Sequence, residues 1–549
     1  MRRFLAATAV LTLGLTSHDA QASTVGNFEN LTPTRGLGKA TNAYAWSMES
    51  HGDDLYVGTY SVNFDWFAAE NYLNQIDNSL SAVDAFRRIW SDSPIAPTLG
   101  GEIYRYDGHE WTQEYGPGVP GADTGIAGFR GMVKHNGHLY AGTANGPTGP
   151  APGAASYSYG GQNPSVTYEQ GDGAKVFVRD DTGTWSELTP GAGPGANNRN
   201  ASIRSMISAN GKLWVGTENP QNPNDPDGDV GPEVWSYTKQ HGWVREVKLD
   251  NGLAVGELSF VNDKLMIGTW GTGADGGFEL LSYDPESGGA PSNVTPMLPG
   301  LEGANGVMEI REFNGKTFVG ALDYQGGFKL LYTEDQHIDE HSVWSTVTTS
   351  GFAEEGGTQS NAYPWSSVEI DGVYYLGTFS TNRSDSPLDT ILGVDVPGEG
   401  RGEIWYSEDG VSWKILEDNG FDSALTYGVR EMVDWQGKLT VGTASNLFVP
   451  DLLSSPYAEY ANLGFEEFLQ QMAAELPQVT AMLTQIGASH EEMAALLGFW
   501  EGPLEGEGRS PFKGFEVYSA HPVPLPAGAL LLISAMLALP ALRRRQQRA

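Results

Sequence analysis

A short apolar stretch that ends in glycine recurs along the middle of the chain. It reads Leu-Tyr-Val-Gly-Thr at 55–59 and Leu-Trp-Val-Gly-Thr at 213–217. The seven glycines of this motif are Gly58, Gly142, Gly216, Gly268, Gly320, Gly377 and Gly442. A tight turn precedes every copy, and several of these turns contain Asn-Gly or Asp-Gly, which indicate a β-hairpin when they separate apolar runs. Each copy therefore predicts two antiparallel strands, A and B, with the glycine in strand B.

A second hairpin follows each copy of the first. Its last strand, D, usually carries a tryptophan, as at Trp185 and Trp243. Its first strand, C, begins with a charged residue, and the seven starts are Glu102, Lys175, Glu233, Glu279, Lys329, Glu403 and Glu516. Repeats of four antiparallel strands around one axis form a β-propeller, and seven copies predict seven blades.

The seventh repeat lacks a strand D after Val517, and the missing strand is found at the other end of the chain. Residues 28–33 (Phe-Glu-Asn-Leu-Thr-Pro) mirror the strand D pattern of residues 185–190 (Trp-Ser-Glu-Leu-Thr-Pro). We expect the N-terminal strand to complete blade seven, which closes the ring and protects its edge. The alternative, a row of disconnected hairpin pairs, leaves many strand edges exposed. The sequence thus predicts an all-β, seven-bladed β-propeller over residues 23–522.

The loops are unequal in length. The A–B and C–D turns are short, whereas the B–C and D–A loops, which emerge on one face of such a blade, are long. Two insertions, at about 62–98 in blade one and 451–510 in blade seven, have apolar residues at helical spacing. Because these blades are neighbours in a closed ring, we expect the helical insertions to form a cap over one sector of this face. The face is the predicted ligand side, although the cap can also be purely structural cover.

The net charge and the lack of cysteine exclude nucleic-acid binding and disulfide bonds. The chain has 68 acidic and 32 basic residues, a formal charge of −36, and no cysteine. A field of this sign repels nucleic acid and anionic membrane surfaces, so nucleic-acid binding is excluded. The absence of cysteine excludes disulfides.

The N-terminus has the order of a secretory signal peptide. Arg2 and Arg3 precede a mostly apolar run at 4–15, and Ala20-Gln21-Ala22 is a small-residue cleavage site. We expect residues 1–22 to be a signal peptide, cut between Ala22 and Ser23, and the protein to be secreted.

The C-terminus carries a second targeting pattern. Val523, Pro524, Leu525, Pro526 and Ala527 precede an apolar run at 528–542, which is slightly short for a full membrane span, and then three arginines. The arginines are expected to stay cytoplasmic. Residues 523–549 resemble the VPLPA-CTERM variety of the PEP-CTERM sorting signals. The resemblance implies an exosortase-like transpeptidase as a partner, transient anchoring in the inner membrane, and transfer to the envelope or beyond in a Gram-negative bacterium that makes extracellular polysaccharide.

One turn carries a second resemblance. Residues 407–413, Ser-Glu-Asp-Gly-Val-Ser-Trp, are similar to the Asp-box turn of sialidase-like propellers, one residue shorter than the usual box. The similarity covers this turn alone and implies no catalytic residue. Kelch and WD40 signatures are absent.

One position of the repeat is the main candidate for a ligand site. Strand A is expected to begin 12 residues before the repeat glycine, nearest the central channel, at Trp46, Arg130, Arg204, Gly256, Met308, Trp365 and Arg430. Three guanidiniums around one channel suit carboxylates or sulfates, which arginine binds with two parallel hydrogen bonds. The alternative is that these arginines pair with the glutamates of strand C in a lattice between blades.

Aromatic residues accompany two of these positions. Blades one and six begin alike, with Tyr44 and Trp46 in one and Tyr363 and Trp365 in the other. Such rings stack on sugar rings when they line a cleft, and the alternative is packing between blades.

The sequence offers one weak metal site. Asp225, Asp227 and Asp229 alternate with small residues in the B–C loop of blade three, a pattern that suits Ca²⁺. The EF-hand pattern is not met, and a solvated acidic turn is the alternative. Otherwise no cofactor is expected, because the sequence contains no H-E-x-x-H, Walker A or nucleophile-elbow motif.

Together these patterns predict a secreted or envelope-associated propeller that binds an extracellular ligand, a polysaccharide above all. The alternative is a lyase or hydrolase that acts on polysaccharide, with Arg130, Arg204 and Arg430 holding its anionic groups.

Overall fold

The computed structural model is almost entirely β-structure. It describes residues 24–25, 28–33, 35–38, 42–61, 100–123, 126–144, 173–196, 200–218, 231–250, 252, 254–271, 277–356, 361–380, 402–418, 420–421, 426–445 and 514–522. The 3₁₀ turns among these residues are η1 (Arg35–Gly38), η6 (Thr295–Met297) and η7 (Ala353–Glu355).

The described strands fall into antiparallel sets of four, each with a long inner hairpin and a shorter outer pair. The inner hairpins, strands A and B, are β3 (Asn42–His51) with β4 (Asp54–Ser61), β7 (Gly128–His135) with β8 (His138–Ala144), β11 (Ser202–Ala209) with β12 (Lys212–Glu218), β15 (Ala254–Val261) with β16 (Lys264–Trp270), β19 (Gly306–Phe313) with β20 (Lys316–Leu322), β23 (Asn361–Ile370) with β24 (Val373–Ser380), and β27 (Thr426–Trp435) with β28 (Lys438–Ser445).

The outer pairs, strands C and D, continue each set away from the axis. They are β5 (Ile103–Tyr106) with β6 (Trp111–Tyr115), β9 (Val176–Arg179) with β10 (Trp185–Glu187), β13 (Glu233–Thr238) with β14 (Gly242–Lys248), β17 (Leu280–Tyr283) with β18 (Ser292–Asn293), β21 (Lys329–Thr333) with β22 (Ser345–Thr348), β25 (Ile404–Ser407) with β26 (Lys414–Glu417), and β29 (Val517–Ala520) with β2 (Phe28–Asn30). A further short strand, β1 (Thr24–Val25), pairs with β2.

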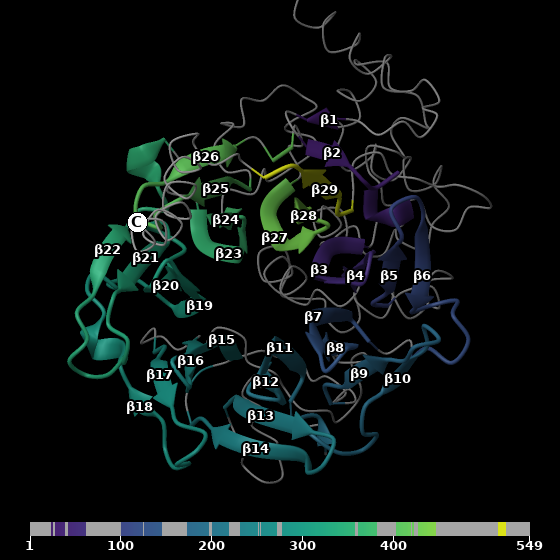
Figure 1. Cartoon of the computed structure of the whole chain (residues 1–549), viewed down its shortest axis with the longest axis horizontal. Helices are drawn as coiled ribbons and strands as arrows, with labels where there is room; N and C mark the ends of the chain where they lie inside the picture. Colours follow the sequence, from purple (N-terminus) through teal and green to yellow (C-terminus); the bar gives the residue numbers. More distant parts are fainter. Residues whose placement is uncertain are drawn as a thin grey trace, which may run out of the picture.

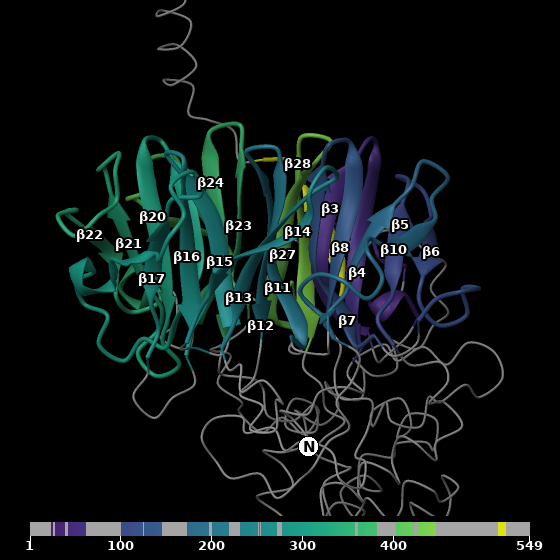
Figure 2. The same ribbon diagram turned by 90° about the horizontal axis from the view of Figure 1, so that it is seen from below.

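The sets stand around a common axis, which is the arrangement of a β-propeller. The first strands of the sets lie innermost (Figure 1), and in the side view the inner strands run roughly parallel to the axis (Figure 2). Single bridges join strand B of one set to strand A of the next, for example Tyr60 to Gly128 and Glu218 to Ala254. A bridge from Ala444 to Tyr44 joins the last set to the first.

The repeated glycine of strand B is required by this close approach. A Cβ atom on Gly216 would lie 2.5 Å from Val255 of the next set, and one on Gly377 would lie 2.4 Å from Val429. Both distances are far inside van der Waals contact, so any side chain here pushes neighbouring sets apart. The repeated glycine of the sequence motif is therefore explained by the close packing of neighbouring strands.

The threonine that follows most of these glycines ties the inner hairpin to the outer pair. Thr217 Oγ1 accepts a hydrogen bond from the backbone N–H of Glu233 (2.8 Å) and donates one to Asn200 Oδ1 (2.9 Å). Asn200 in turn donates to the buried carboxylate of Glu233 (2.7 Å). All these polar groups are buried and satisfied, which is the condition for placing them between β-strands.

The N-terminal strand occupies the predicted place. Glu29 pairs with Ser519 and Asn30 with Tyr518, and the N–H of Leu31 donates to the carbonyl of Val517 (2.8 Å). The prediction that residues 28–33 pair with the strand beginning at Val517 is confirmed by these contacts.

The turn that resembles an Asp box is held by its own atoms. Asp409 Oδ1 accepts hydrogen bonds from the N–H groups of Val411 (2.8 Å) and Ser412 (2.6 Å), and Trp413 Nε1 donates to the carbonyl of Gly410 (2.9 Å). Asp107, Asp180 and Asp284 cap C–D turns in the same way. The turn is thus a structural device of the outer hairpin.

Several predicted segments lie outside the described residues: the signal peptide at 1–22, the insertions at about 62–98 and 451–510, and the sorting signal at 523–549. Within the part of the chain that the structure describes, no helix has the length and apolar character to cross a membrane.

The pairing of β2 with β29 predicts that Phe28 stabilises the fold. Its side chain is buried, contacts Phe421 edge to face (5.2 Å between ring centroids), and belongs to the core that includes Tyr518. Replacing Phe28 by alanine should lower the free energy of unfolding by about 3–5 kcal/mol, the usual cost of such a cavity. Urea denaturation measures this, with the exposed Val343→Ala as a control that changes stability by less than about 0.5 kcal/mol. An unchanged stability of Phe28→Ala would contradict the role of this strand.

Candidate functional site

Every inner hairpin described has a β-bulge at the same place in strand A. In blade three, for example, Ile203 pairs with Thr217 and Ser205 pairs with Gly216, so Arg204 has no partner in the ladder. The seven residues skipped in this way are Trp46, Arg130, Arg204, Gly256, Met308, Trp365 and Arg430. A bulge bends its strand and redirects the side chain of the extra residue.

These are the seven positions that the sequence predicts at the channel, with one correction. They lie two to four residues inside strand A, whereas the sequence places them at its start. The strand extends further because its first residues bridge to strand B of the preceding set, as Gly128 does to Tyr60.

The three arginines meet at one cavity on the axis. Arg130, Arg204 and Arg430 line a space of about 170 Å³ together with Trp365. Glu257, Glu309, Arg311 and Glu431 also line it. The three arginines are on β7, β11 and β27, so residues that are far apart in the sequence line one cavity.

Arg130 is held by partners on both sides. Its guanidinium forms an ion pair with Glu218, the last residue of β12 in the neighbouring blade, and both side chains are nearly buried. It also lies over the indole of Trp46, 5.1 Å from the ring centroid. Its charge is therefore neutralised within the protein.

Arg430 is also paired. Its Nη1 donates to Glu431 Oε1 at 2.6 Å, and its guanidinium lies 5.3 Å from the ring centroid of Trp365. Burial lowers the pKa of Arg430 and raises the pKa of Glu431 to about 7.

Arg204 differs from the other two because no carboxylate among the described residues pairs with it. Its guanidinium lies over the indole of Trp270 (5.2 Å), and its Nη2 lies 3.2 Å from the sulfur of Met308. Its buried Nε has no hydrogen-bond partner, which is also true of Arg130 and Arg430. Burial, together with the nearby charges of Arg130 and Arg430, lowers the pKa of Arg204 to about 9. At neutral pH it remains a cation that the charge of Glu218 stabilises from a distance, with no ion pair among the described residues.

The strand C glutamates are not the partners of the channel arginines, so the predicted lattice is wrong. Glu403 accepts hydrogen bonds from Asn361 Nδ2 (2.6 Å) and Trp405 Nε1 (2.8 Å) of its own blade. Glu516 binds Asn30 and Arg35 near the N-terminus. None of the strand C glutamates lines the cavity.

Two further carboxylates line the cavity in unlike environments. Glu309 accepts hydrogen bonds from Ser367 Oγ (2.6 Å) and Tyr374 (3.3 Å), and forms an ion pair with Arg311 (3.5 Å). Among the contacts described, Glu257 has no hydrogen bond at its carboxyl group. Burial and the nearby charge of Glu309 raise the pKa of Glu257 to about 8, against the opposing charges of Arg311 and Arg204.

Sequence reasoning missed these acidic residues. Glu257, Glu309 and Glu431 each directly follow the bulged position of their blade. The recurrence of glutamate at this place in three repeats is a signal that the sequence does contain, but only the bulge shows that two successive residues of one strand both reach the cavity.

The four predicted aromatic residues pack mainly on other rings. Tyr363 stacks on Phe379 (4.4 Å), Trp46 contacts Tyr60 (4.3 Å), and the hydroxyl of Tyr44 accepts a hydrogen bond from Tyr427. The first two contacts each lie within one inner hairpin, whereas Tyr44–Tyr427 and Trp365–Tyr427 (6.0 Å) cross between hairpins, in agreement with the packing alternative. Of the four, Trp365 is the one that lines the cavity.

The remaining predicted sites lie outside the described residues. They are Asp225, Asp227 and Asp229 of the acidic loop, Val523 to Ala527 of the sorting motif, and the cleavage site at Ala22 and Ser23. Over the described ranges, no group of three or more histidine, cysteine or acidic side chains is arranged to hold a metal ion.

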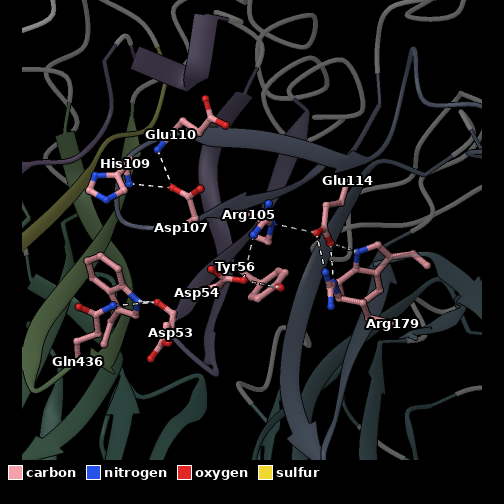
Figure 3. Close-up of polar contacts among 12 residues, drawn as sticks. Asp53, Asp54, Tyr56, Arg105, Asp107, His109, Glu110, Glu114, Arg179 and Gln436 are labelled. Atoms are coloured by element: carbon pink, nitrogen blue, oxygen red, sulfur yellow. Dashed lines mark hydrogen bonds and ion pairs between the residues drawn. The ribbon is translucent and has the colours of Figure 1, made fainter. Parts of the chain in front are cut away.

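A second charged cluster, on the outer strands of blades one and two, provides a contrast. Arg179 donates two hydrogen bonds of 2.8 Å to Glu114, and Arg105 forms ion pairs with Asp54 (3.2 Å) and Glu114 (3.3 Å). Figure 3 shows these side chains pointing toward one another between neighbouring strands. Each charge in this cluster has its counter-charge, so it serves to join the blades.

Comparisons with known proteins do not identify a family for this chain. No family model and no curated protein matches the chain. Among solved structures, the putative 6-phosphogluconolactonase of Bacteroides fragilis has a TM-score of 0.37 and 10% identity, over 64% of this chain and 85% of that one. A GH43 β-1,3-galactosidase gives 0.26 and 11%, over 57% and 51%. An α-L-arabinofuranosidase of Clostridium thermocellum gives 0.27 and 14%, over 52% and 92%. At these scores none of the likenesses carries an argument about function.

The difference between Arg130 and Arg204 predicts opposite effects on stability. Replacing Arg130 by glutamine leaves the buried carboxylate of Glu218 without this ion pair and should lower the free energy of unfolding by about 3 kcal/mol. Replacing Arg204 by glutamine removes a cation that burial and two like charges disfavour, so stability should stay the same or rise. Urea denaturation at pH 7 measures both, and a large loss in Arg204→Gln would show that Arg204 is structural.

Proposed function

We propose that this chain is a secreted propeller that binds an acidic extracellular polysaccharide, with an acidic group of the ligand held at the central cavity. We further infer a ring of seven blades that the N-terminal strand closes. The pairing of β2 with β29 and the bridge from Ala444 to Tyr44 support this closure. The insertions at about 62–98 and 451–510 are proposed to be helical and to cap the ligand side.

The observation that carries the proposal is the uncompensated guanidinium of Arg204. A buried charge without a partner costs free energy, which an anionic ligand recovers on binding. Arg130 and Arg430 line the same cavity but are paired with Glu218 and Glu431, so Arg204 supplies the positive charge left over in a chain whose formal charge is −36. An anion is therefore attracted to this cavity against the overall field.

The size of the cavity limits what enters it. A volume of about 170 Å³ lies below the usual range of about 300–1,000 Å³ for a pocket that encloses a whole ligand. The cavity therefore suits one acidic group or sugar unit, with the remainder of a polymer lying across the mouth. We place the mouth on the side where strand A begins and strand B ends, which is the predicted ligand side.

One exposed aromatic residue supports a sugar ligand on this side. Tyr324 follows the end of β20, has 41% of its surface exposed, and contacts Tyr363 edge to face (6.3 Å). Aromatic faces beside a charged site are suited to stacking on sugar rings.

A second candidate function is cleavage of such a polymer by a lyase or hydrolase. The observation in its favour is that Glu257 and Glu431 titrate near neutral pH beside guanidinium groups. Carboxyl groups with pKa values near the working pH are suited to proton transfer.

The test is a binding and cleavage assay with the purified chain against acidic and neutral oligosaccharides. We expect calorimetry to detect acidic ligands alone, and Arg204→Gln to weaken binding by about 1.5–3 kcal/mol, the range for a hydrogen bond to a charged group. Arg105→Gln, in the outer cluster, is the matched control and should leave affinity unchanged. Equal binding of neutral ligands, or full affinity in Arg204→Gln, would refute the proposal, and release of shortened products would favour the enzyme.

Secretion and sorting form a separate part of the proposal. The signal peptide pattern at 1–22 and the order of motif, apolar run and arginines at 523–549 motivate it. Intact-mass analysis of the extracellular fraction should find a chain that begins at Ser23 and lacks Arg543 to Ala549. An extracellular chain that still carries both segments would exclude this processing.

A further inference from the structure

The ionisable side chains of the central cavity are unequally paired. Those that line it are Arg130, Arg204, Glu257, Glu309, Arg311, Arg430 and Glu431. Five of them take part in ion pairs, which are Arg130 with Glu218, Arg430 with Glu431, and Arg311 with Glu309. Arg204 and Glu257 are the two that, among the contacts of the described residues, have no ion pair.

These two groups come from neighbouring blades. Arg204 is the bulged residue of β11, and Glu257 follows the bulged Gly256 of β15. They interact electrostatically, yet they are not within ion-pair distance of each other. Gly256 itself adds no side chain to the ring. A cation and a carboxyl group thus face the same cavity, each with unused hydrogen-bonding capacity.

We propose that Arg204 and Glu257 together form a subsite for the carboxylate of a uronic acid, and that binding takes up a proton at Glu257. This rests on the proposed function. Arg204 donates N–H groups to the bound carboxylate, and Glu257 in its protonated form donates its O–H to the same group. The bound carboxylate then accepts hydrogen bonds from both residues.

The charged groups around Glu257 favour this protonated form. Its cross-strand partner on β16 is Gly268, which carries no charge. The groups that face it from the other elements are Arg204 on β11, Glu309 and Arg311 on β19, and Glu431 on β27. Neither cation forms an ion pair with Glu257, because Arg311 is paired with Glu309 and Arg204 binds the ligand. A bound anion adds a further negative charge and stabilises the proton on Glu257.

The chemistry selects a carboxylate over a sulfate. Hydrogen bonds from an O–H group to a carboxylate are short and about twice as strong as those between neutral groups. A sulfate ester is a much weaker base, so it gains less from the O–H of Glu257. The subsite therefore favours uronic acids among acidic sugars.

Coupling between the two events is reciprocal. If the anion raises the proton affinity of Glu257, protonation of Glu257 raises the affinity for the anion by the same factor. With the pKa of Glu257 near 8, its protonated fraction is about 0.97 at pH 6.5 and about 0.24 at pH 8.5, so the dissociation constant should rise roughly fourfold between them.

The experiment is calorimetry of the full chain with D-glucuronate at these two pH values, in buffers that differ in ionisation enthalpy. We expect the fourfold change and uptake of most of one proton at pH 8.5. Glu257→Gln should lose the fourfold part of the pH dependence and the matching proton uptake, leaving what Glu431 and Arg204 contribute, and inorganic sulfate should bind more weakly than glucuronate. The control Glu312→Gln changes an exposed glutamate of β19 outside the cavity and should behave like the wild type.

A second readout needs no ligand. The folded pKa of Glu257 lies above the value of 4.5 that applies to the unfolded chain, so the folded protein binds more protons between pH 4.5 and 8. Its contribution to stability therefore falls as the pH rises through this window. In Glu257→Gln this part of the fall should disappear, so the variant gains stability relative to the wild type from pH 5 to pH 8.

The possible results distinguish the proposed function from the subsite proposal. If glucuronate does not bind at either pH, the proposed function and the subsite fail together. If it binds equally at both pH values, or if Glu257→Gln keeps the wild-type pH dependence and proton uptake, the subsite proposal alone is wrong. A stability profile of Glu257→Gln parallel to that of the wild type also overturns it.

Discussion

The close approach of neighbouring inner strands is the constraint on which the rest of the structure depends. Gly216 and Gly377 have no room for a side chain because strand A of the next set lies directly against them. Strands packed this closely converge on the axis, where their side chains compete for a small volume. The bulges relieve this crowding and at the same time direct the ring that includes Arg130, Arg204 and Arg430 into one cavity.

The pairing of charged side chains distinguishes the candidate ligand site from the cluster of ion pairs that holds neighbouring blades together. In the outer cluster of Arg105, Glu114 and Arg179, each guanidinium meets a carboxylate, and the contacts cross from one blade to the next. In the cavity, Arg130 and Arg430 are satisfied in the same manner, whereas Arg204 is left with an indole and a thioether. Such an arrangement is unfavourable for the stability of the free protein, and it is the basis of the proposed anion site.

Much of the architecture can be predicted because its physical causes are local. The hairpin turns, the repeated glycine and the outer-strand pattern at residues 28–33 all follow from backbone geometry and close packing. The partners of charged side chains cannot be predicted in this way. Arg130 pairs with Glu218 across a blade boundary, and Glu257 reaches the cavity because a bulge shifts the alternation of its strand. Both depend on side-chain reach in three dimensions, which strand periodicity alone does not contain.

The contact between the two ends of the propeller has a consequence for how the chain folds as it is made. Asn30 and Glu516, which share a hydrogen bond, are separated by 486 residues. The N-terminal strand β2 is made early and its partner β29 almost last, so β2 lacks this partner until synthesis is nearly complete. Contacts of such long range make folding slow. A chain that stays incomplete for this long is exposed to aggregation and has more need of a chaperone.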